Sequence, residues 1–395
     1  MVELKKLIIM RVKKKNDITK NRFQEIHDLK AQYKGKLPLI DMGIGEDKTM
    51  PDDKIVNTLI ESVKFSSTHK YADNGLDLLK SEGVRYLKEH FYINKNVSNI
   101  AITMGTKQAL SILVFLLCKH KDTIITTKPG YVVFANVSRL LDVNIYELPL
   151  KKENNFLPDL ESIPKSILKK TKVFQINYPN NPTGAVATKE FYCRLIELAK
   201  QYGFYIINDA AYLDLSFKKP LSIFSIETDY YKIIELYTLS KSHNMTGYRI
   251  GLLVSNEIIA RKYERFKDNF DSGQFLGIQY AAIEALSNYS ISRDLRIKYH
   301  NRAKRIYAIF KKYGFELNEP EGTFFLYVKA INGFSSFEMA SLLLNDYGIV
   351  SIPYNDASSY LRFSLTYETE NEEGFYEEFE KRISLFAQKK LRENS

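Results

Sequence analysis

The chain has 395 residues, 45% of them apolar and 26% charged, and these ordinary proportions exclude a disordered or low-complexity polypeptide. Because a chain of this length exceeds what one small core can organise, we expect a globular protein of two domains. The formal net charge is +10, but the compact basic runs are at residues 6–15 and 387–392 while the other lysines alternate with acids, so we interpret the charge as a solvated basic surface and expect no nucleic-acid partner.

The N-terminal residues and the cysteines predict a cytoplasmic protein without a membrane segment. The apolar stretch at 7–10 is too short for a signal-peptide core, and the one at 109–118 is about half of a membrane span. Cys118 and Cys193 lie in apolar, helix-like stretches without CxxC spacing, as is typical of reduced core residues.

From about residue 97 to 255, short β-branched or apolar runs alternate with longer helical patterns. The strand-like runs are at 99–103, 122–127, 172–177, 204–209, 232–240 and 249–255. This alternation predicts an α/β fold with a mostly parallel sheet covered by helices on both faces. In such sheets the ligand crevice lies beyond the carboxyl ends of the strands, so we expect the active site in the loops that follow them.

After residue 258 the pattern is largely helical to about 313. Short strands follow at 324–330, 348–352 and 361–366, with a helical segment between them and another at the end. We therefore predict a smaller α+β domain, formed by residues 1–45 with 291–395, beside a large domain at 46–290.

The first strand ends carry residues suited to an anion or a flat ligand. Gly105, Thr106 and Lys107 open a helix, and the free backbone N–H groups of a helix start bind anions, although Thr is also an ordinary cap. Tyr131 follows the second strand, where its ring either stacks on a ligand or packs in the core. In "YPNNPTGAVAT" two prolines and a glycine fix a rigid turn that exposes Asn181 as a donor.

The later strand ends carry ionisable groups. Asp209 leaves an apolar strand three residues before Tyr212, and Lys241 follows the next strand. A lysine in a partly dry site loses its proton near neutral pH and acts as a nucleophile or Schiff-base partner. Arg249 supplies a planar fork for a phosphate or carboxylate. Arg362 lies inside an apolar strand, where an unpaired charge is costly, so we expect a carboxylate partner from either the protein or a substrate.

Together these residues are the parts needed for pyridoxal phosphate chemistry. The chain resembles the fold-type I pyridoxal-phosphate aminotransferases of class I/II over roughly residues 35–385, with "NNPTG", "NDAAY" and "SKSHNMTGYRIG" in the expected order. Within that group it is most similar to the LL-diaminopimelate aminotransferases, in "PLIDMGIGE", "YADNGL", "ENNFLPDL", "KDNFDSGQF" and "DASSYLRFSLTYE". The resemblance implies a large domain with a seven-stranded, mostly parallel sheet.

The resemblance also implies roles for single residues. Lys241 would hold the cofactor as an internal aldimine and then move the proton between substrate Cα and cofactor C4′, while Asp209 would keep the pyridine nitrogen protonated. Asn181 and Tyr212 would hydrogen-bond the phenolic oxygen, and Tyr131 would stack on the ring. The residues expected around the cofactor phosphate are Gly105, Thr106, Lys107, Thr238, Ser240 and Arg249. The residues expected at the substrate α-carboxylate are Gly45, Asn181 and Arg362.

Tyr71 would reach the cofactor phosphate of a neighbouring subunit, which implies a homodimer with shared active sites. No metal is implied. The implied reaction moves an amino group between an amino acid and a 2-oxo acid by a ping-pong mechanism, with LL-2,6-diaminopimelate and tetrahydrodipicolinate as one pair and glutamate and 2-oxoglutarate as the other.

Three residues depart from the family pattern and leave the substrate open. His243 stands where an aromatic residue such as Phe is usual, and Tyr248 and Tyr354 stand where Trp is common. For His243 we predict a packing role. The alternatives are an aminotransferase for aspartate, an aromatic or a specialised-pathway amino acid, a pyridoxal-phosphate lyase acting at Cβ, and a non-catalytic cofactor-sensing regulator.

Overall fold

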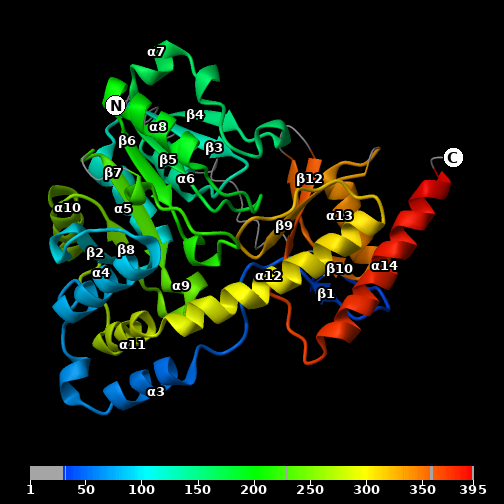
Figure 1. Ribbon diagram of the computed structural model, residues 1–395, viewed down its shortest axis with the longest axis horizontal. Helices are drawn as coiled ribbons and strands as arrows, with labels where there is room; N and C mark the ends of the chain where they lie inside the picture. Colours follow the sequence, from blue (N-terminus) through cyan, green and yellow to red (C-terminus); the bar gives the residue numbers. More distant parts are fainter. Residues whose placement is uncertain (1–29, 32, 227–229, 332, 356–358, 394–395) are drawn as a thin grey trace, which may run out of the picture.

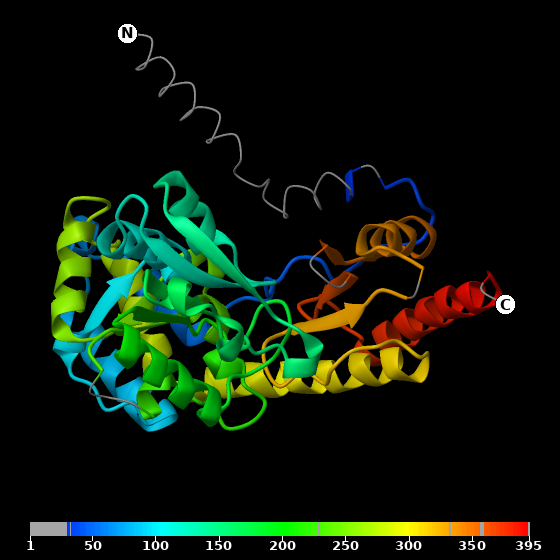
Figure 2. The ribbon, with the colours of Figure 1, turned by 90° about the horizontal axis from the view of Figure 1, so that it is seen from above.

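The computed structural model of the chain describes residues 30–31, 33–226, 230–331, 333–355 and 359–393. The basic run at 6–15, residues 1–29 of the predicted small domain, and residues 356–358 of "DASSYLRFSLTYE" lie outside the described residues. In Figures 1 and 2 a larger α/β layer structure and a smaller α+β part lie side by side, and one long helix, α12 (Tyr289–Lys312), runs from the first into the second. The division at residues 290 and 291 stays a prediction.

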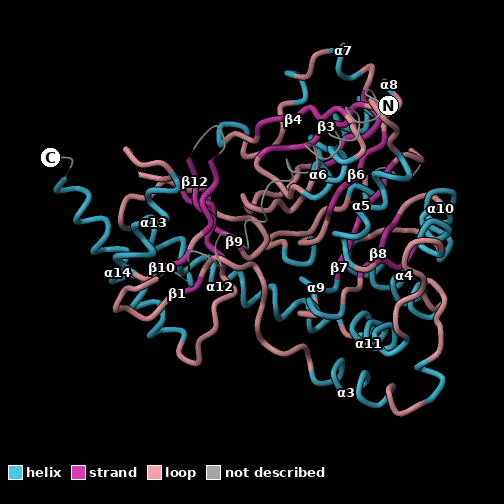
Figure 3. The backbone as a smooth tube through the Cα atoms, turned by 180° about the vertical axis from the view of Figure 1, so that it is seen from behind, coloured by secondary structure: helices cyan, strands magenta, loops and turns pink. Residues whose placement is uncertain are grey.

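The larger part is built on a seven-stranded sheet with the order β2-β8-β7-β6-β5-β3-β4. Only β8 runs antiparallel to its neighbours, β2 and β7, so the predicted mostly parallel sheet is confirmed. Figure 3 shows its strands in magenta among helices in cyan. The strands are β2 (Ile100–Thr103), β3 (Thr123–Lys128), β4 (Asn144–Pro149), β5 (Thr171–Ile176), β6 (Tyr205–Asp209), β7 (Ile233–Thr238) and β8 (Gly251–Val254). β4 has no counterpart among the predicted runs, because as an edge strand it is largely open to solvent and lacks an apolar run.

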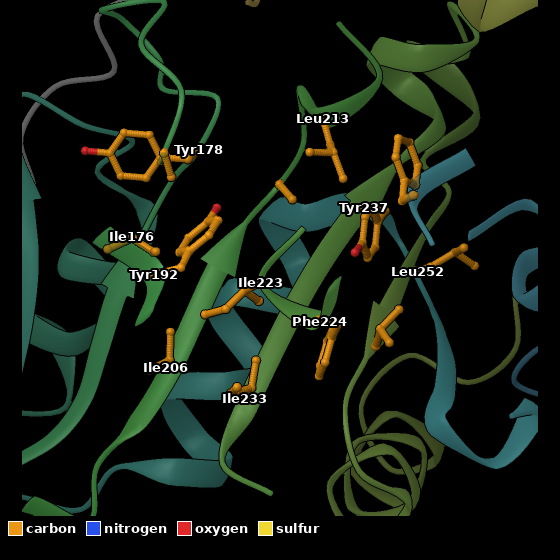
Figure 4. Close-up of a cluster of buried hydrophobic side chains, with 14 of the residues drawn as sticks. Ile176, Tyr178, Tyr192, Ile206, Leu213, Ile223, Phe224, Ile233, Tyr237 and Leu252 are labelled. Carbon is orange, nitrogen blue, oxygen red and sulfur yellow. The ribbon is translucent and has the colours of Figure 1, made fainter. Parts of the chain in front are cut away.

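Helices cover both faces of this sheet. One face packs on α5, α6 and α10, and the other on α4, α8 and α11. Successive side chains of a strand point to opposite faces of the sheet. Ile207 therefore packs in the core beneath α5, α6 and α10, and Ile206 in the core beneath α4, α8 and α11. Figure 4 shows part of the latter core, with Ile206, Ile233, Tyr237 and Leu252. The bounds of α3 to α11, which include these six helices, are α3 (Asp53–Ser62), α4 (Asp77–Phe91), α5 (Gly105–Leu117), α6 (Val133–Leu140), α7 (Lys165–Leu168), α8 (Lys189–Tyr202), α9 (Leu239–Ser242), α10 (Glu257–Asp268) and α11 (Leu276–Ser287).

Local signals set the helix ends. The Thr188 side chain accepts a hydrogen bond from the Phe191 amide at the start of α8, and Gly203, with φ 76°, ends that helix.

Cys118 is buried and Cys193 is half-buried, and both are free thiols, so the prediction of a core position is correct only for Cys118. Among the described residues, no helix combines the length and apolar character that crossing a bilayer requires.

The smaller part contains a three-stranded antiparallel sheet, β11-β12-β9, and a parallel pair, β1 with β10. Its elements are β1 (Ile40–Asp41), β9 (Phe325–Lys329), β10 (Ile349–Val350), β11 (Ile352–Asn355), β12 (Ser359–Ser364), α13 (Ser336–Tyr347) and α14 (Glu372–Glu393). The single strand predicted at 348–352 is wrong, because β10 pairs with β1 whereas β11 pairs with β12. The core of this part joins α12 and α14 through Phe310 and Phe379, whose ring centroids are 5.6 Å apart.

Candidate active site

A pocket opens where the loops after β2, β3, β5, β6 and β7 meet the smaller part. The space within it, including the open solvent at its mouth, is about 710 Å³. The predicted residues that line it are Gly45, Thr106, Lys107, Tyr131, Asn181, Asp209, Tyr212, Thr238, Ser240, Lys241, Arg249 and Arg362. The fold therefore brings together residues that are spread over more than three hundred positions of the chain.

The single turn α9 carries Lys241 into this pocket. Thr238 caps the turn, since its Oγ1 accepts a 3.2 Å hydrogen bond from the Ser240 amide. Lys241 Nζ donates a 3.0 Å hydrogen bond to the backbone oxygen of Gly45. It also lies 5.3 Å from the centroid of the Phe324 ring, so one side of the amine is apolar.

Burial lowers the pKa of Lys241 to about 8. The Glu46 carboxylate opposes this effect, while the cations of Arg362 and Arg249 lower the pKa further. A substantial fraction of the side chain is therefore a neutral amine near physiological pH, which is the form required of a base or a nucleophile.

Asp209 is the last residue of β6 and is only 2% exposed. Burial raises its pKa to about 7, although hydrogen bonds from the Ala211 amide and the Thr106 side chain lower it. Within the described part of the chain, its Oδ1 has no hydrogen-bond partner. A buried carboxylate oxygen without a partner is costly, so the site suits a cationic or N–H donor from a ligand.

Arg249 and the start of α5 form a corner rich in donors. Arg249 Nη1 donates a 2.9 Å hydrogen bond to the Thr246 oxygen and lies 3.5 Å from Ser240 Oγ. Gly105 has φ +72°, a backbone conformation that favours glycine, and a Cβ there would lie 3.0 Å from Arg249 Nη2. No described carboxylate forms an ion pair with Arg249. Helix N–H groups, hydroxyls and an unpaired guanidinium suit a phosphate.

Arg362 reaches the opposite wall from β12 and is 3% exposed. Its Nη1 donates to Asn181 Oδ1 and its Nη2 to the Gly43 oxygen, both at 2.9 Å, and the guanidinium lies 4.2 Å from the Phe325 ring centroid. Over the residues that the structure describes, no carboxylate pairs with it, and its Nε has no partner. Among the described residues Arg362 therefore has no carboxylate partner, and its guanidinium can pair with the carboxylate of a ligand.

Two tyrosines complete the wall beside Asp209. Tyr212 packs edge-on against Phe324 and Phe325, with ring centroids 5.3 and 5.6 Å away. Burial raises the pKa of Tyr212 well above its ordinary value and that of Tyr131 to about 12. Both phenols therefore remain protonated donors at physiological pH.

The pocket also contains residues that were not predicted: Asn177, Ala211, Thr246 and Phe325. Asn177 is the last residue of the predicted strand at 172–177 and donates a 2.6 Å hydrogen bond from Nδ2 to the backbone oxygen of Asp209, so its position was a usable signal. Phe325 comes from the smaller part, and nothing local marks it. Tyr71, predicted to reach the cofactor phosphate of a neighbouring subunit, is fully exposed and does not line the pocket of its own chain.

The residues that depart from the family pattern lie outside the pocket lining. His243 is fully buried, with its Nδ1 2.7 Å from Ser242 Oγ and its ring 5.7 Å from that of Tyr86. Burial lowers the pKa of His243 to about 3, so it is neutral and packs as predicted. Tyr354 packs on Tyr327, with ring centroids 5.6 Å apart, and Tyr248 does not line the pocket.

The mostly parallel sheet, the smaller α+β part and the lysine-bearing pocket between them define a fold-type I transferase. The family model "Aminotransferase class I and II" matches residues 38–377. The LL-diaminopimelate aminotransferase of Methanocaldococcus jannaschii is 37% identical, over 89% of this chain and 87% of that protein. The chain therefore belongs to the class I and II aminotransferases, a family that in general depends on pyridoxal phosphate, and the family prediction is confirmed.

Solved structures agree. Substrate-bound BacF from Bacillus subtilis has a TM-score of 0.86 at 30% identity, covering 92% of this chain and 95% of that one. An aspartate aminotransferase from Thermotoga maritima has a TM-score of 0.85 at 27% identity, covering 95% and 99%.

Proposed function

We propose that this aminotransferase acts on LL-2,6-diaminopimelate and tetrahydrodipicolinate as one pair and on glutamate and 2-oxoglutarate as the other, in lysine biosynthesis. The Methanocaldococcus jannaschii relative, named for this amino acid, supports the assignment. The observation that carries substrate binding is Arg362, a buried guanidinium with no carboxylate partner among the described residues. Its planar fork suits the α-carboxylate of an amino acid or oxo acid, with Asn181 and the Gly45 backbone beside it.

Pyridoxal phosphate fits the pocket on three observations. The partnerless Oδ1 of Asp209 suits a protonated pyridine nitrogen. The corner at Gly105 and Arg249 suits the phosphate, with Thr106, Lys107, Thr238 and Ser240 around it. Lys241, with a pKa of about 8, suits the aldehyde. When bound, the cofactor supplies an electron-accepting ring that stabilises the negative charge left at substrate Cα.

The side chains then have separate tasks. Lys241 Nζ takes the proton from substrate Cα and later returns a proton, because one amine serves as base and then as acid. Asp209 would keep the ring nitrogen of the cofactor protonated. Asn181 and Tyr212 would donate hydrogen bonds to its phenolic oxygen, and Tyr131 would stack on its ring. Since one site serves both half-reactions, we expect ping-pong kinetics.

We also propose a homodimer with shared sites and a cytoplasmic location. The loop after Tyr71 is held rigidly: the Leu76 amide donates to Gln279 Oε1 at 2.8 Å, and a Cβ at Gly273 would lie 1.9 Å from the Ala72 oxygen. Tyr71 itself is fully exposed, and Phe65, six positions earlier in the chain, is 63% exposed. Exposed aromatic rings next to a loop that is held in place support contact with a second copy of the chain.

A second candidate is an aminotransferase for aspartate, supported by the 27% identity to the Thermotoga maritima enzyme. A half-reaction screen separates the candidates: cofactor-loaded protein is mixed with single amino donors, and the loss of its cofactor absorbance is followed. We expect LL-2,6-diaminopimelate and glutamate to react fastest. A faster reaction with aspartate, and none with LL-2,6-diaminopimelate, would overturn the first candidate and support the second.

A further inference from the structure

The segment at residues 43–50, here called the strap, lies on the connection from β1 to α3, between the two parts of the molecule (Figure 1). Gly45 in the strap lines the pocket. It contains no helix or strand of its own. Its backbone oxygens at Gly43 and Gly45 accept hydrogen bonds from Arg362 Nη2 at 2.9 Å and from Lys241 Nζ at 3.0 Å. The position of the strap therefore affects where the side chains of Arg362 and Lys241 lie in the site.

Polar contacts, rather than apolar burial, hold the far half of the strap. Met50 is 75% exposed, and the residues from 48 to 50 are all exposed. A segment with little buried apolar surface opens easily unless specific hydrogen bonds fix it.

The first of these contacts joins the strap to α12. The Asp47 side chain, 8% exposed, accepts hydrogen bonds from Tyr299 OH and, at 3.0 Å, from Lys298 Nζ. Asp47 Oδ1 also accepts from the Thr49 amide at 3.0 Å and the Thr49 hydroxyl at 2.7 Å. Tyr299 is 1% exposed within the core of the smaller part, so Asp47 is tied to a rigid support.

The second contact joins the strap to the loop that carries Lys241. Asn244 lies three residues after Lys241 and has φ 56°. Its Nδ2 donates to the backbone oxygen of Thr49, and it lies 3.0 Å from Thr49 Oγ1 and 3.4 Å from the Met50 oxygen. The strap is thereby fixed both to α12 and to the loop that follows α9.

We propose that Asp47, through Tyr299, and Asn244 are positioning residues that hold the strap in the conformation that binds the substrate carboxylate. This inference rests on the proposed roles of Arg362 and Gly45 in that binding. The apparent dissociation constant of a ligand rises in inverse proportion to the fraction of protein in the binding-competent state. If loss of one contact leaves the strap in place about a tenth of the time, KM rises about tenfold while kcat stays nearly constant.

Two variants test this inference without disturbing the charge of the pocket. Tyr299→Phe removes the hydroxyl that donates a hydrogen bond to Asp47. Asn244→Gly removes the side-chain amide that donates to Thr49, and glycine readily adopts the left-handed backbone of that position. Lys48→Gln is the matched control, because Lys48 is in the strap but its side chain is exposed, 4.0 Å from Glu368. Each cofactor-loaded protein is examined for hydrogen exchange at residues 43–50 and for KM and kcat with glutamate.

We expect faster exchange at residues 43–50 and a KM raised about five- to twentyfold in both variants, with the wild-type values in Lys48→Gln. Asp47→Asn also removes the ion pair with Lys298, so it should raise exchange and KM at least as much as Tyr299→Phe. Combining the two substitutions should add less than the sum of their separate effects, because they share the bond between Tyr299 and Asp47. Unchanged exchange in both variants would overturn the inference, whatever the substrate. Faster exchange with an unchanged KM would keep the strap contacts but overturn the proposed role of the strap in carboxylate binding.

Discussion

Arg362 donates a 2.9 Å hydrogen bond to Oδ1 of Asn181, 181 positions earlier in the chain. This bond joins the antiparallel sheet of the smaller part to the rigid "NNPTG" turn after β5. In the proposed roles, Arg362 would hold the substrate carboxylate and Asn181 would contact the cofactor, so the groups that bind the two ligands contact each other directly. A change at Arg362 should therefore affect substrate binding first.

We expect Arg362→Lys to raise KM for both the amino acid and the oxo acid by about ten- to a hundredfold, or about 1.4–2.7 kcal/mol. A lysine ammonium cannot make the two parallel hydrogen bonds of a guanidinium. Arg302→Lys is the matched control, because Arg302 is also buried but pairs with Glu372 in the smaller part. Steady-state kinetics should show normal KM for the control, and a normal KM for Arg362→Lys would contradict the role in carboxylate binding.

The rate at which cofactor-free protein captures pyridoxal phosphate should rise with pH to a plateau above the Lys241 pKa of about 8. Only the neutral amine reacts with an aldehyde, and a lowered pKa makes that form available at lower pH. At pH 6 the rate should be about a hundredfold below the plateau, since each unit below the pKa costs about tenfold in neutral amine. Stopped-flow absorbance measures this rate, with Nα-acetyl-lysine as the reference for an ordinary amine. A midpoint near that of the reference would contradict the effect of burial.

Asp209→Asn should stabilise the cofactor-free protein at pH 8 and weaken its binding of the cofactor. In the folded protein the pKa of Asp209 is about 7, whereas its ordinary value is 3.8. The protonated carboxyl therefore makes its full contribution to the free energy of unfolding below about pH 4, and this contribution is lost as the pH rises towards 7. The shift of about three units corresponds to at most about 4 kcal/mol. We expect urea unfolding to show a stabilisation by the variant that is about 2–3 kcal/mol larger at pH 8 than at pH 5.

The control for this prediction is Asp294→Asn, since that side chain is 65% exposed. Its stability relative to the wild type should not change between the two pH values. An Asp209→Asn difference that is equal at pH 5 and pH 8 would show that the carboxyl is not a buried acid with a raised pKa.

The shared-site dimer predicts complementation between two defective chains. Lys241→Ala and Tyr71→Ala chains are each expected to lose most activity as homodimers. In a mixed dimer, one of the two sites combines an intact Lys241 with an intact Tyr71 of the partner. Co-expressed and purified mixed dimers should therefore regain turnover, whereas activity no greater than that of the two homodimers would contradict the shared site.

The order of the chain by itself determined the α/β fold, the family and most of the pocket. Each of Gly105, Tyr131, Asn181, Asp209 and Lys241 follows a recognisable strand, and parallel strands bring their carboxyl ends to one edge of a sheet. The local pattern was therefore enough to predict that these residues lie near one another. It did not predict Phe325 as a pocket residue, β4 as a strand, or the division of residues 348–352 into two strands. An edge strand and a change of pairing partner leave no local periodicity.

Only the tertiary structure decided the chemistry of the charged groups. A lysine with a pKa of about 8 and an aspartate with a pKa of about 7 owe these values to burial, which arises when separate segments pack. The same holds for the bonds of Arg362 to Asn181 and of the strap to Tyr299 and Asn244. The sequence names the groups, but their solvation and their distances are properties of segments that are remote in the chain and adjacent only in the fold.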